Sequence, residues 1–413
     1  MNIVYFSHYF TPEIGAPSAR IYDLSQQWLE LGHRPQVVTC FPNHPNGHLY
    51  PGYQHRCYLH ENLDGIEVHR HWTYVTPNKG LIRKTLGHLS YVPGARFISG
   101  RHVRSAEVAI GTSPTLFAAT AAAGFARRHN IPFIMEVRDL WPAIFVELGI
   151  LRNPQIIRWL ERWEMRLYQQ AARVVVVTES FRKKLIERGV PKDKVLTIPN
   201  GADVDFWKLT EDSSEKRRQL GFEDRFIVLY IGAHGISHAL GRILDTAHEL
   251  RAIRQIHFLF VGEGAEKEKL KQRAGELELT NVTFLDAVGK DEVREFYAAA
   301  DVCLVPLRNV SLFETFIPSK MFEMMSMARP IVGSVRGEAA DILRRSNGAV
   351  VVSPENSQEL ARAIMDLYHS DDQARRRMGE RGRQFVEQYY SRKVIAASYL
   401  ELLTEAVAAY QRQ

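Results

Sequence analysis

Phe226-Ile227-Val228-Leu229-Tyr230-Ile231-Gly232 is the stretch that decides the fold. Its six consecutive apolar residues indicate a parallel strand covered on both faces, and the glycine after them begins a loop. Residues 174–177, four valines in a row, have the same character. Similar runs alternate with helical stretches, which predicts two doubly wound α/β sheets. We expect strands near residues 2–7, 36–40, 66–70, 107–110, 132–136, 173–178, 195–198, 226–231, 256–261, 282–285, 302–305, 330–333 and 349–352.

The chain has 413 residues, too many for one hydrophobic core, so two domains are expected. Residues 200–221 turn polar and irregular and mark the linker. We place the first domain at residues 1–205 and the second at 206–391, with a last helix within 392–413 returning to the first domain. In open sheets of this kind, ligands bind at the carboxyl ends of the strands, in the loops that follow them.

Composition excludes several classes of protein. The chain is 45% apolar and 24% charged, and it has no apolar run long enough to predict a membrane-spanning helix. Residues 1–6 read as a buried strand and lack the basic start and cleavage pattern of a signal peptide. Three scattered cysteines indicate buried thiols in a reducing cytoplasm. His69 and His71 have no third ligand nearby, and Asp203 and Asp205 lie in an apparent turn, so no metal site is expected.

Positive charge concentrates in the first half. Residues 1–200 hold 24 Lys and Arg against 15 Asp and Glu (+9), and residues 201–413 hold 29 against 32 (−3), which together give +6. Residues 68–106 contain no acidic residue and mix cations with large apolar side chains, a pattern that suits an anionic membrane surface. A solvated basic helix face over an ordinary core is the alternative, and no nucleic-acid recognition motif is present. The residues of interest here are Trp72, Lys79, Arg83, Lys84, Arg96 and Arg101.

Three loops after predicted strands carry possible ligand-binding groups. Residues 7–18 include Gly15, which would let backbone approach a phosphate closely. Residues 232–238 contain two glycines and two imidazoles, those of His234 and His238. Residues 136–142 place Arg138 and Asp139 at a strand end, with Trp141 as a flat wall for a sugar ring. The alternatives are a simple βα turn, a solvent-facing histidine and a structural Arg–Asp pair.

A fourth segment, residues 315–332, predicts a turn, a helix and then another strand. Pro318 and Ser319 precede the helix-forming run, whose first N–H groups would face an anion or a polyhydroxy ligand. Glu323, inside the helix, could accept hydrogen bonds from hydroxyl groups. An ordinary capped helix is the alternative reading.

In their order and spacing, these loops resemble glycosyltransferase family 4, retaining enzymes of the GT-B fold, over almost the whole chain. The likeness is greatest to bacterial surface-polysaccharide and O-antigen enzymes that transfer N-acetyl-fucosamine or related amino sugars. The matching stretches are residues 11–15, 31–33, 138–142, 198–203, 261–264, 300–306 and 318–332.

The resemblance implies two Rossmann-like domains facing across a cleft, the first for the acceptor and membrane and the second for the nucleotide-sugar donor. Glu323 matches the glutamate that binds the ribose hydroxyls, and Gly15 matches the small residue facing the β-phosphate. Residues 316–319 match the backbone that meets the sugar and phosphates, namely Phe316, Ile317, Pro318 and Ser319. Ala287 and Val288 lie where the base is held. A donor site of this family needs no metal or other cofactor.

The chain departs from the family pattern at three places. The first glutamate of the family's pair falls on Thr315, with Glu314 one place too early. The arginine and lysine that grip the pyrophosphate fall on Ala233 and His238, which leaves His238, with Arg242 or Lys320, for this task. The active-site histidine is replaced by Arg138, whereas Asp139 matches.

The resemblance therefore predicts a retaining, metal-independent glycosyltransferase on the cytoplasmic face of the plasma membrane. It would move a sugar, an N-acetylated amino sugar, from a UDP donor to a polyprenyl-diphosphate-linked glycan in surface polysaccharide synthesis. Two alternatives remain: a non-hydrolysing sugar-nucleotide 2-epimerase, and a peripheral membrane scaffold with a vestigial nucleotide site.

Overall fold

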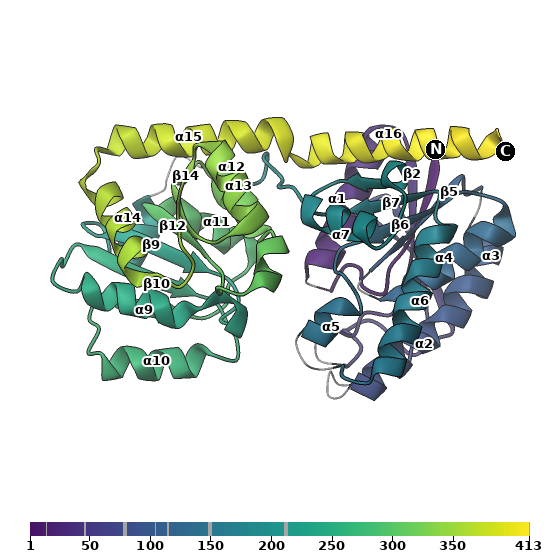
Figure 1. The fold of residues 1–413 in the computed structure, drawn as a ribbon, viewed down its shortest axis with the longest axis horizontal. Helices are drawn as coiled ribbons and strands as arrows, with labels where there is room; N and C mark the ends of the chain where they lie inside the picture. Colours follow the sequence, from purple (N-terminus) through teal and green to yellow (C-terminus); the bar gives the residue numbers. More distant parts are fainter. Residues whose placement is uncertain are drawn as a thin grey trace. The chain divides into compact units, whose positions relative to one another are not determined.

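The computed structural model describes residues 1–13, 15–44, 47–76, 81–103, 105–113, 115–147, 151–209 and 214–412. These form two compact units: Met1–Asn200 with Arg392–Gln413, and Gly201–Ser391 (Figure 1). The division thus falls at Asn200, whereas the sequence placed it after Asp205. Each unit is an α/β domain with helices on both faces of its sheet.

The first unit has, among its described residues, a sheet of eight strands in the order β3-β4-β2-β1-β5-β6-β7-β8. Its strands are β1 (Asn2–Phe6), β2 (Arg34–Cys40), β3 (Tyr58–Leu63), β4 (Ile66–His71), β5 (Val108–Thr112), β6 (Phe133–Val137), β7 (Arg173–Val176) and β8 (Val195–Thr197). Its helices are α1 (Ala16–Glu30), α2 (Leu81–Pro93), the π-helical η1 (Gly94–Ile98), α3 (Ser99–His102), α4 (Leu116–His129), α5 (Ala143–Glu147), α6 (Pro154–Gln170), α7 (Glu179–Glu187), the 3-10 turn η2 (Lys192–Lys194) and α16 (Arg392–Gln411).

The second unit has a six-stranded parallel sheet in the order β11-β10-β9-β12-β13-β14, counted over the same described ranges. Its strands are β9 (Phe226–Ile231), β10 (Ile256–Val261), β11 (Val282–Leu285), β12 (Val302–Pro306), β13 (Ile331–Ser334) and β14 (Ala349–Val352). Its helices are α8 (Ser214–Leu220), α9 (Leu240–Glu249), α10 (Lys267–Glu276), α11 (Lys290–Ala299), α12 (Lys320–Ser326), α13 (Gly337–Ser346), α14 (Ser357–His369) and α15 (Asp372–Tyr389), with the 3-10 turns η3 (Ile236–His238) and η4 (Ser311–Thr315).

Every strand predicted from the sequence is present, which confirms the doubly wound fold class. The apolar runs are buried on both faces, as in β9, where all six residues are buried. In β1, Val4 and Phe6 join one core and Ile3 and Tyr5 join the other, on the opposite face of the sheet. The direction of winding reverses at β1 in the first sheet and at β9 in the second, so the loops after these two strands open at the switch points.

The prediction missed one strand, β3, which pairs antiparallel with β4 at the edge of the first sheet. Its sequence is polar and its burial is partial, so it lacks the apolar run used to find the others. Asp64 and Gly65 connect the two strands with positive φ angles of 51° and 87°. That dipeptide is the signal of a tight hairpin, and it was available in the sequence.

Helix α16 belongs to the first unit and packs on α1. The indole nitrogen of Trp28 donates to the carbonyl oxygen of Ala396 at 3.2 Å, and its ring lies 5.6 Å from that of Tyr399. Arg392 forms an ion pair with Asp23 at 2.5 Å where α16 begins. These contacts cover the apolar face of α1.

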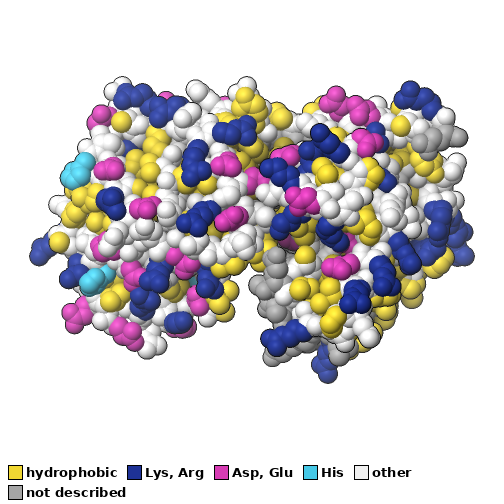
Figure 2. All heavy atoms as spheres, viewed as in Figure 1, with side chains coloured by type: hydrophobic (Ala, Val, Ile, Leu, Met, Phe, Trp, Pro, Cys, Tyr) yellow, Lys and Arg dark blue, Asp and Glu magenta, His cyan; other side chains and the backbone are white. Residues whose placement is uncertain are grey.

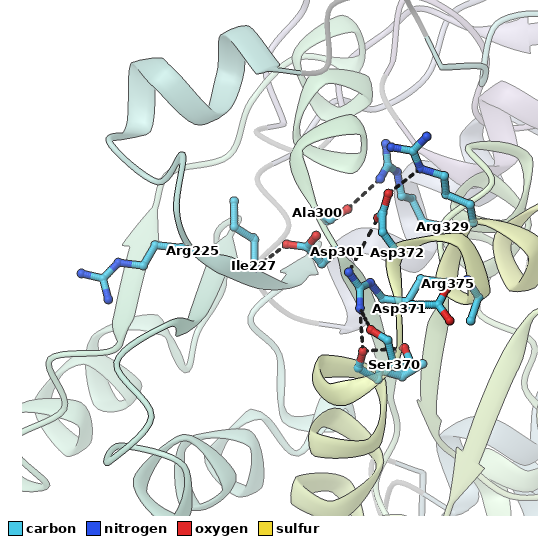
Figure 3. Close-up of polar contacts among 12 residues, drawn as sticks. Arg225, Ile227, Ala300, Asp301, Arg329, Ser370, Asp371, Asp372 and Arg375 are labelled. Atoms are coloured by element: carbon cyan, nitrogen blue, oxygen red, sulfur yellow. Dashed lines mark hydrogen bonds and ion pairs between the residues drawn. The ribbon is translucent and has the colours of Figure 1, made fainter.

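Partly buried polar contacts connect the second sheet at the amino ends of its strands (Figure 3). Asp301, just before β12, accepts the backbone N–H of Ile227 in β9 at 2.7 Å. Arg329 donates to the carbonyl oxygen of Ala300 at 3.0 Å. These contacts lie at the opposite edge from the loops that follow the strands, so that edge is structural and the carboxyl edge carries the candidate site.

A buried carboxylate organises the first unit. Glu136 on β6 is fully buried and accepts hydrogen bonds from the hydroxyls of Tyr5 and Thr112 and from Nε of Arg20 at 3.0 Å. Arg20 also donates to the carbonyl oxygens of residues 198 and 199. Burial alone would raise the pKa of Glu136, but the charges of Arg20 and Arg138 and the two hydroxyl hydrogen bonds hold it below its ordinary value.

We expect Glu136→Gln to lower the free energy of unfolding of the first unit by about 3–5 kcal/mol, because Arg20 would keep a buried charge without its counter-ion. Chemical denaturation followed by tryptophan fluorescence measures this, since five of the six tryptophans lie in this unit. The control is Glu179→Gln, which removes an exposed ion pair with Arg182 and should cost less than about 1 kcal/mol. Equal effects of the two substitutions would contradict the assignment.

Candidate active site

The loops after β9 and β10 pack against each other through glycines at the carboxyl edge of the second sheet. A Cβ atom on Gly262 would lie 2.0 Å from the carbonyl oxygen of Gly232, and one on Gly264 would lie 2.4 Å from that of His234. Gly232 and Gly262 also have φ angles of 140° and 145°. No residue with a side chain fits at these positions without moving backbone, so the loop geometry depends on glycine.

Lys320, the first residue of α12, contacts the loop after β9, residues 232–238, which we call the glycine loop. Its Nζ donates to the carbonyl oxygen of Ile231 at 3.0 Å and lies 4.3 Å from the ring centre of Tyr230. A Cβ atom on Gly232 would come within 2.4 Å of that Nζ. Burial lowers the pKa of Lys320 to about 8, although the charge of Glu323 acts in the opposite direction. The ammonium group therefore lies where β9 ends and loses its proton readily.

The two histidines of the glycine loop have different environments. His234 is fully buried beside Tyr230, Phe260 and Phe284, and no described residue hydrogen-bonds to either of its ring nitrogens. Burial lowers its pKa to about 4. We predicted a donor-binding role from the sequence, but in this structure the imidazole packs inside the unit and presents no exposed nitrogen.

His238 lies in η3 and is only partly buried. Its Nδ1 is 3.4 Å from the carbonyl oxygen of Pro306, and burial together with the charge of Lys320 lowers its pKa to about 4. A neutral imidazole that donates Nδ1–H to this carbonyl leaves Nε2 as an acceptor. His238 in this tautomer suits a sugar hydroxyl better than a phosphate oxygen, which changes the role expected from the sequence.

The remaining loop residues of the second unit lie near the same edge. Arg242 is exposed in the first turn of α9 and forms a surface ion pair with Asp245 at 3.1 Å. Ala287 is exposed and Val288 packs against the core in the loop after β11, where the base was expected. Both therefore follow a strand of the same sheet.

Contacts within η4 and with α13 fix the position of the segment before α12. The hydroxyl of Thr315 is buried and donates to the carbonyl oxygen of Leu312 at 2.9 Å, so its proton is used within η4. A Cβ atom on Gly337 would lie 2.0 Å from the carbonyl oxygen of Glu314, which shows how closely α13 supports this turn. Phe316, Ile317 and Pro318 are partly buried and Ser319 is exposed. Ser319 precedes α12 without a side-chain capping bond, which argues against the alternative of an ordinary capped helix.

Glu323 lies in the first turn of α12, inside the helix as expected from the sequence. It is partly exposed, and the hydroxyl of Tyr297 donates to its Oε2 at 3.3 Å. Lys320 and Glu323 thus stand one turn apart on one short helix, next to the loop after β9. The structure brings together a cation, a carboxylate and a glycine-lined backbone at one sheet edge.

In the first unit, Arg138 and Asp139 follow β6 as predicted. Both of their backbone N–H groups point to the hydroxyl oxygen of Ser113, at 2.8 and 3.3 Å. Nε and Nη1 of Arg138 are buried, and no described residue accepts a hydrogen bond from them. Burial lowers the pKa of Arg138 and raises that of Asp139, each partly offset by neighbouring charges. Gly15 is exposed at the start of α1.

The predicted membrane-facing residues separate into two groups. Trp72, Arg83 and Arg101 are exposed. Arg96 is partly buried against α4, where a Cβ atom on Gly124 would lie 2.7 Å from its Nε, so its stem packs on that helix and it is a weaker docking residue than expected. Lys79 and the side chain of Lys84 lie outside the described residues.

Sequence reasoning missed an apolar pocket in the first unit, with a volume of about 930 Å³. Of the predicted residues, Gly15 and Trp141 line it, and Trp141 packs edge-on against Phe145 and Trp163. Much of the remaining lining comes from α6, whose apolar residues at helical spacing in residues 156–167 were a readable signal. Over the described ranges, no cluster of side chains could hold a metal ion, and no helix has the length and hydropathy to cross a bilayer.

Comparison with known proteins agrees with this architecture. The model for "Glycosyl transferase 4-like domain" matches residues 15–201, and that for "Glycosyl transferases group 1" matches residues 225–370. The putative colanic acid biosynthesis glycosyl transferase WcaI of Escherichia coli K12 is 22% identical over 374 residues, 88% of this chain and 91% of the relative.

Solved structures establish the fold. Sucrose-phosphate synthase from Thermosynechococcus elongatus superposes with a TM-score of 0.75 at 19% identity, over 99% of each chain. HepE from Anabaena, solved in complex with UDP-glucose, gives a TM-score of 0.69 at 16% identity, over 98% of this chain and 100% of that one. With one family model on each unit and the fold common to these enzymes, the chain belongs to the group 1 glycosyltransferases, family 4, and has the GT-B fold.

Proposed function

We propose that this glycosyltransferase moves a sugar, with retention of anomeric configuration, from a UDP-sugar to a polyprenyl-diphosphate-linked glycan in bacterial surface polysaccharide synthesis. An N-acetylated amino sugar is the donor that the sequence resemblance favours. Relatives support the setting, because WcaI is described as a colanic acid enzyme and HepE was solved with UDP-glucose. The enzyme would work on the cytoplasmic face of the membrane, without a metal.

The observation that carries the donor half is the position of Lys320. Its ammonium lies over Gly232 at the end of β9, where the winding of the sheet reverses and ligands of such sheets bind. A cation there neutralises the charge that develops on the departing UDP. Glu323, one turn along the same helix, would take the ribose hydroxyls, and Nε2 of His238 would accept from a hydroxyl of the sugar.

In the first unit, the proposal rests on the hydrogen bonding of Arg138. Buried N–H groups are nearly always hydrogen-bonded, and no described residue bonds to Nε and Nη1 of this guanidinium. An anionic group of the substrate, a phosphate or a carboxylate, would satisfy both donors. Arg138 would then do by charge what the family's histidine does by hydrogen bonding, with Asp139 beside it.

We expect Glu323→Ala to weaken UDP binding at least about 10- to 100-fold, because each hydrogen bond to a carboxylate contributes roughly 1.5–3 kcal/mol. Isothermal calorimetry with UDP measures the effect. The control is Glu314→Ala, which removes the exposed acid nine positions earlier and should leave the affinity unchanged. If the two variants bind UDP equally well, Glu323 does not hold the ribose.

The affinity for UDP should fall as the pH rises through about 8, since the charged form of Lys320 binds the diphosphate and its pKa lies there. Above that pKa, the dissociation constant should rise by up to about tenfold per pH unit. Titrations between pH 7 and 9 measure this, and Lys320→Met should bind weakly at every pH. If UDP affinity depends on pH in the same way in Lys320→Met and in the wild type, the dependence arises from titration of the nucleotide and not of Lys320.

The transfer reaction itself is tested with a panel of UDP- and GDP-sugars and a short lipid-diphosphate glycan. We expect UDP release that requires the acceptor and a product with the donor's anomeric configuration. Turnover of a UDP-sugar without acceptor would favour the 2-epimerase instead. Failure to bind any sugar nucleotide would favour a scaffold.

A further inference from the structure

The apolar pocket of the first unit lies between two helices. Leu89 and His88 of α2 line it together with Ile156, Trp159 and other residues of α6. Phe117 at the start of α4 and Trp141 after β6 also line it. Its volume of about 930 Å³ is that of a ligand pocket, and of the predicted donor-binding residues Gly15 lines it.

The mouth of the pocket is unusually apolar. Of the lining residues, Ile156 and Trp159 on α6 are 47% and 59% exposed and Leu89 on α2 is 50% exposed; Leu86, on α2 but outside the lining, is also 50% exposed. Large apolar side chains that cluster on a surface mark an interaction site, whereas single ones do not. Figure 2 shows apolar and basic side chains intermixed on the first unit, where Figure 1 places α2 and α6.

Exposed cations outnumber exposed acids on the two helices that line the pocket, where Glu161 of α6 is the acid. Arg162 and Arg166 of α6 line the pocket and are exposed, and Arg158 is exposed on the same helix. On α2, Arg83 is exposed as well. Apolar side chains within a frame of cations match a bilayer surface with anionic headgroups, because the apolar groups enter the acyl region while the cations stay among the phosphates.

The other end of the pocket is polar. Tyr9, His44 and His88 line it, with the Tyr9 hydroxyl 3.1 Å from Nε2 of His88 and the rings of Tyr9 and His44 5.0 Å apart. The buried carboxylate of Glu13 lines it too, and it already accepts the backbone N–H groups of residues 10, 43 and 44. Gly15 also lines the pocket here, at the loop after β1. The pocket therefore connects an apolar, cation-rimmed mouth with the switch point of the first sheet.

We propose that this pocket holds the first part of the isoprenoid chain of the lipid acceptor, and that α2 and α6 together rest on the bilayer. The proposal rests on the proposed function and extends it by naming the site of the acceptor's apolar chain. The chain would pass from the bilayer into the protein without crossing water, and its diphosphate would lie at the histidine-lined end. Because transfer from lipid to an apolar pocket changes hydration little, the pocket would set the position of the diphosphate more than it adds affinity in a membrane.

A series of water-soluble acceptors tests whether the pocket binds the apolar chain of the acceptor. Sugar diphosphates with saturated or prenyl chains of increasing length, used below their micellar concentrations, should show a KM that falls about tenfold for every two methylenes buried. Ile156→Ser with Trp159→Ser should flatten this dependence and release the protein from vesicles that contain phosphatidylglycerol. Both residues are exposed, so the double variant should keep its fold.

The matched control is Leu31→Ser, which replaces an equally exposed apolar residue that does not line the pocket and should change neither readout. UDP affinity by calorimetry separates the two levels of the proposal: if UDP does not bind, the proposed function fails. If UDP binds and transfer proceeds, but KM is independent of chain length, the pocket proposal alone is overturned. A wild-type dimer that the double variant converts to monomer would also overturn it, because a second copy would then cover the mouth.

Discussion

The contact between Gly262 and the carbonyl oxygen of Gly232 is the constraint on which the donor half of the structure depends. Two βα loops can lie against each other only where neither carries a side chain, and a Cβ atom on Gly262 would meet that oxygen at 2.0 Å. Once they are stacked, the end of β9 is left open and the ammonium of Lys320 occupies the space beside Gly232. The depressed pKa of this lysine follows from the burial that the same packing imposes.

Arg20 and Arg138 both lie near Glu136 of β6, but their hydrogen bonding differs. Arg20 has acceptors on Glu136 and on the backbone of residues 198 and 199, so its charge is used in holding the unit together. Arg138 lies near the same carboxylate, but two of its buried N–H groups have no acceptor among the described residues. Such an incomplete group costs stability unless a ligand completes it, which is why it marks a site more clearly than the satisfied pair does.

Much of the fold was predictable because parallel strands buried on both faces leave long apolar runs, such as residues 226–231. Strand β3 escaped because an edge strand needs only partial burial, and its polar sequence carries no such run. The positions of the site loops followed from the strands, whereas side-chain directions did not: His234 turned into the core, and the stem of Arg96 settled on α4. The pocket beside α6 is lined by segments spread from Tyr9 to Arg166, and the helical spacing of α6 alone cannot show that they come together.

The return of α16 to the first unit has a consequence for biosynthesis. The second unit is one continuous segment, Gly201–Ser391, whose ends meet in a β-bridge between Ala202 and Ser391. It can therefore fold from one uninterrupted stretch of chain. The first unit needs two separate stretches, because the apolar face of α1 around Trp28 is covered by α16, which is synthesised after the whole second unit. Although its residues come first, the amino-terminal half is therefore the last to close.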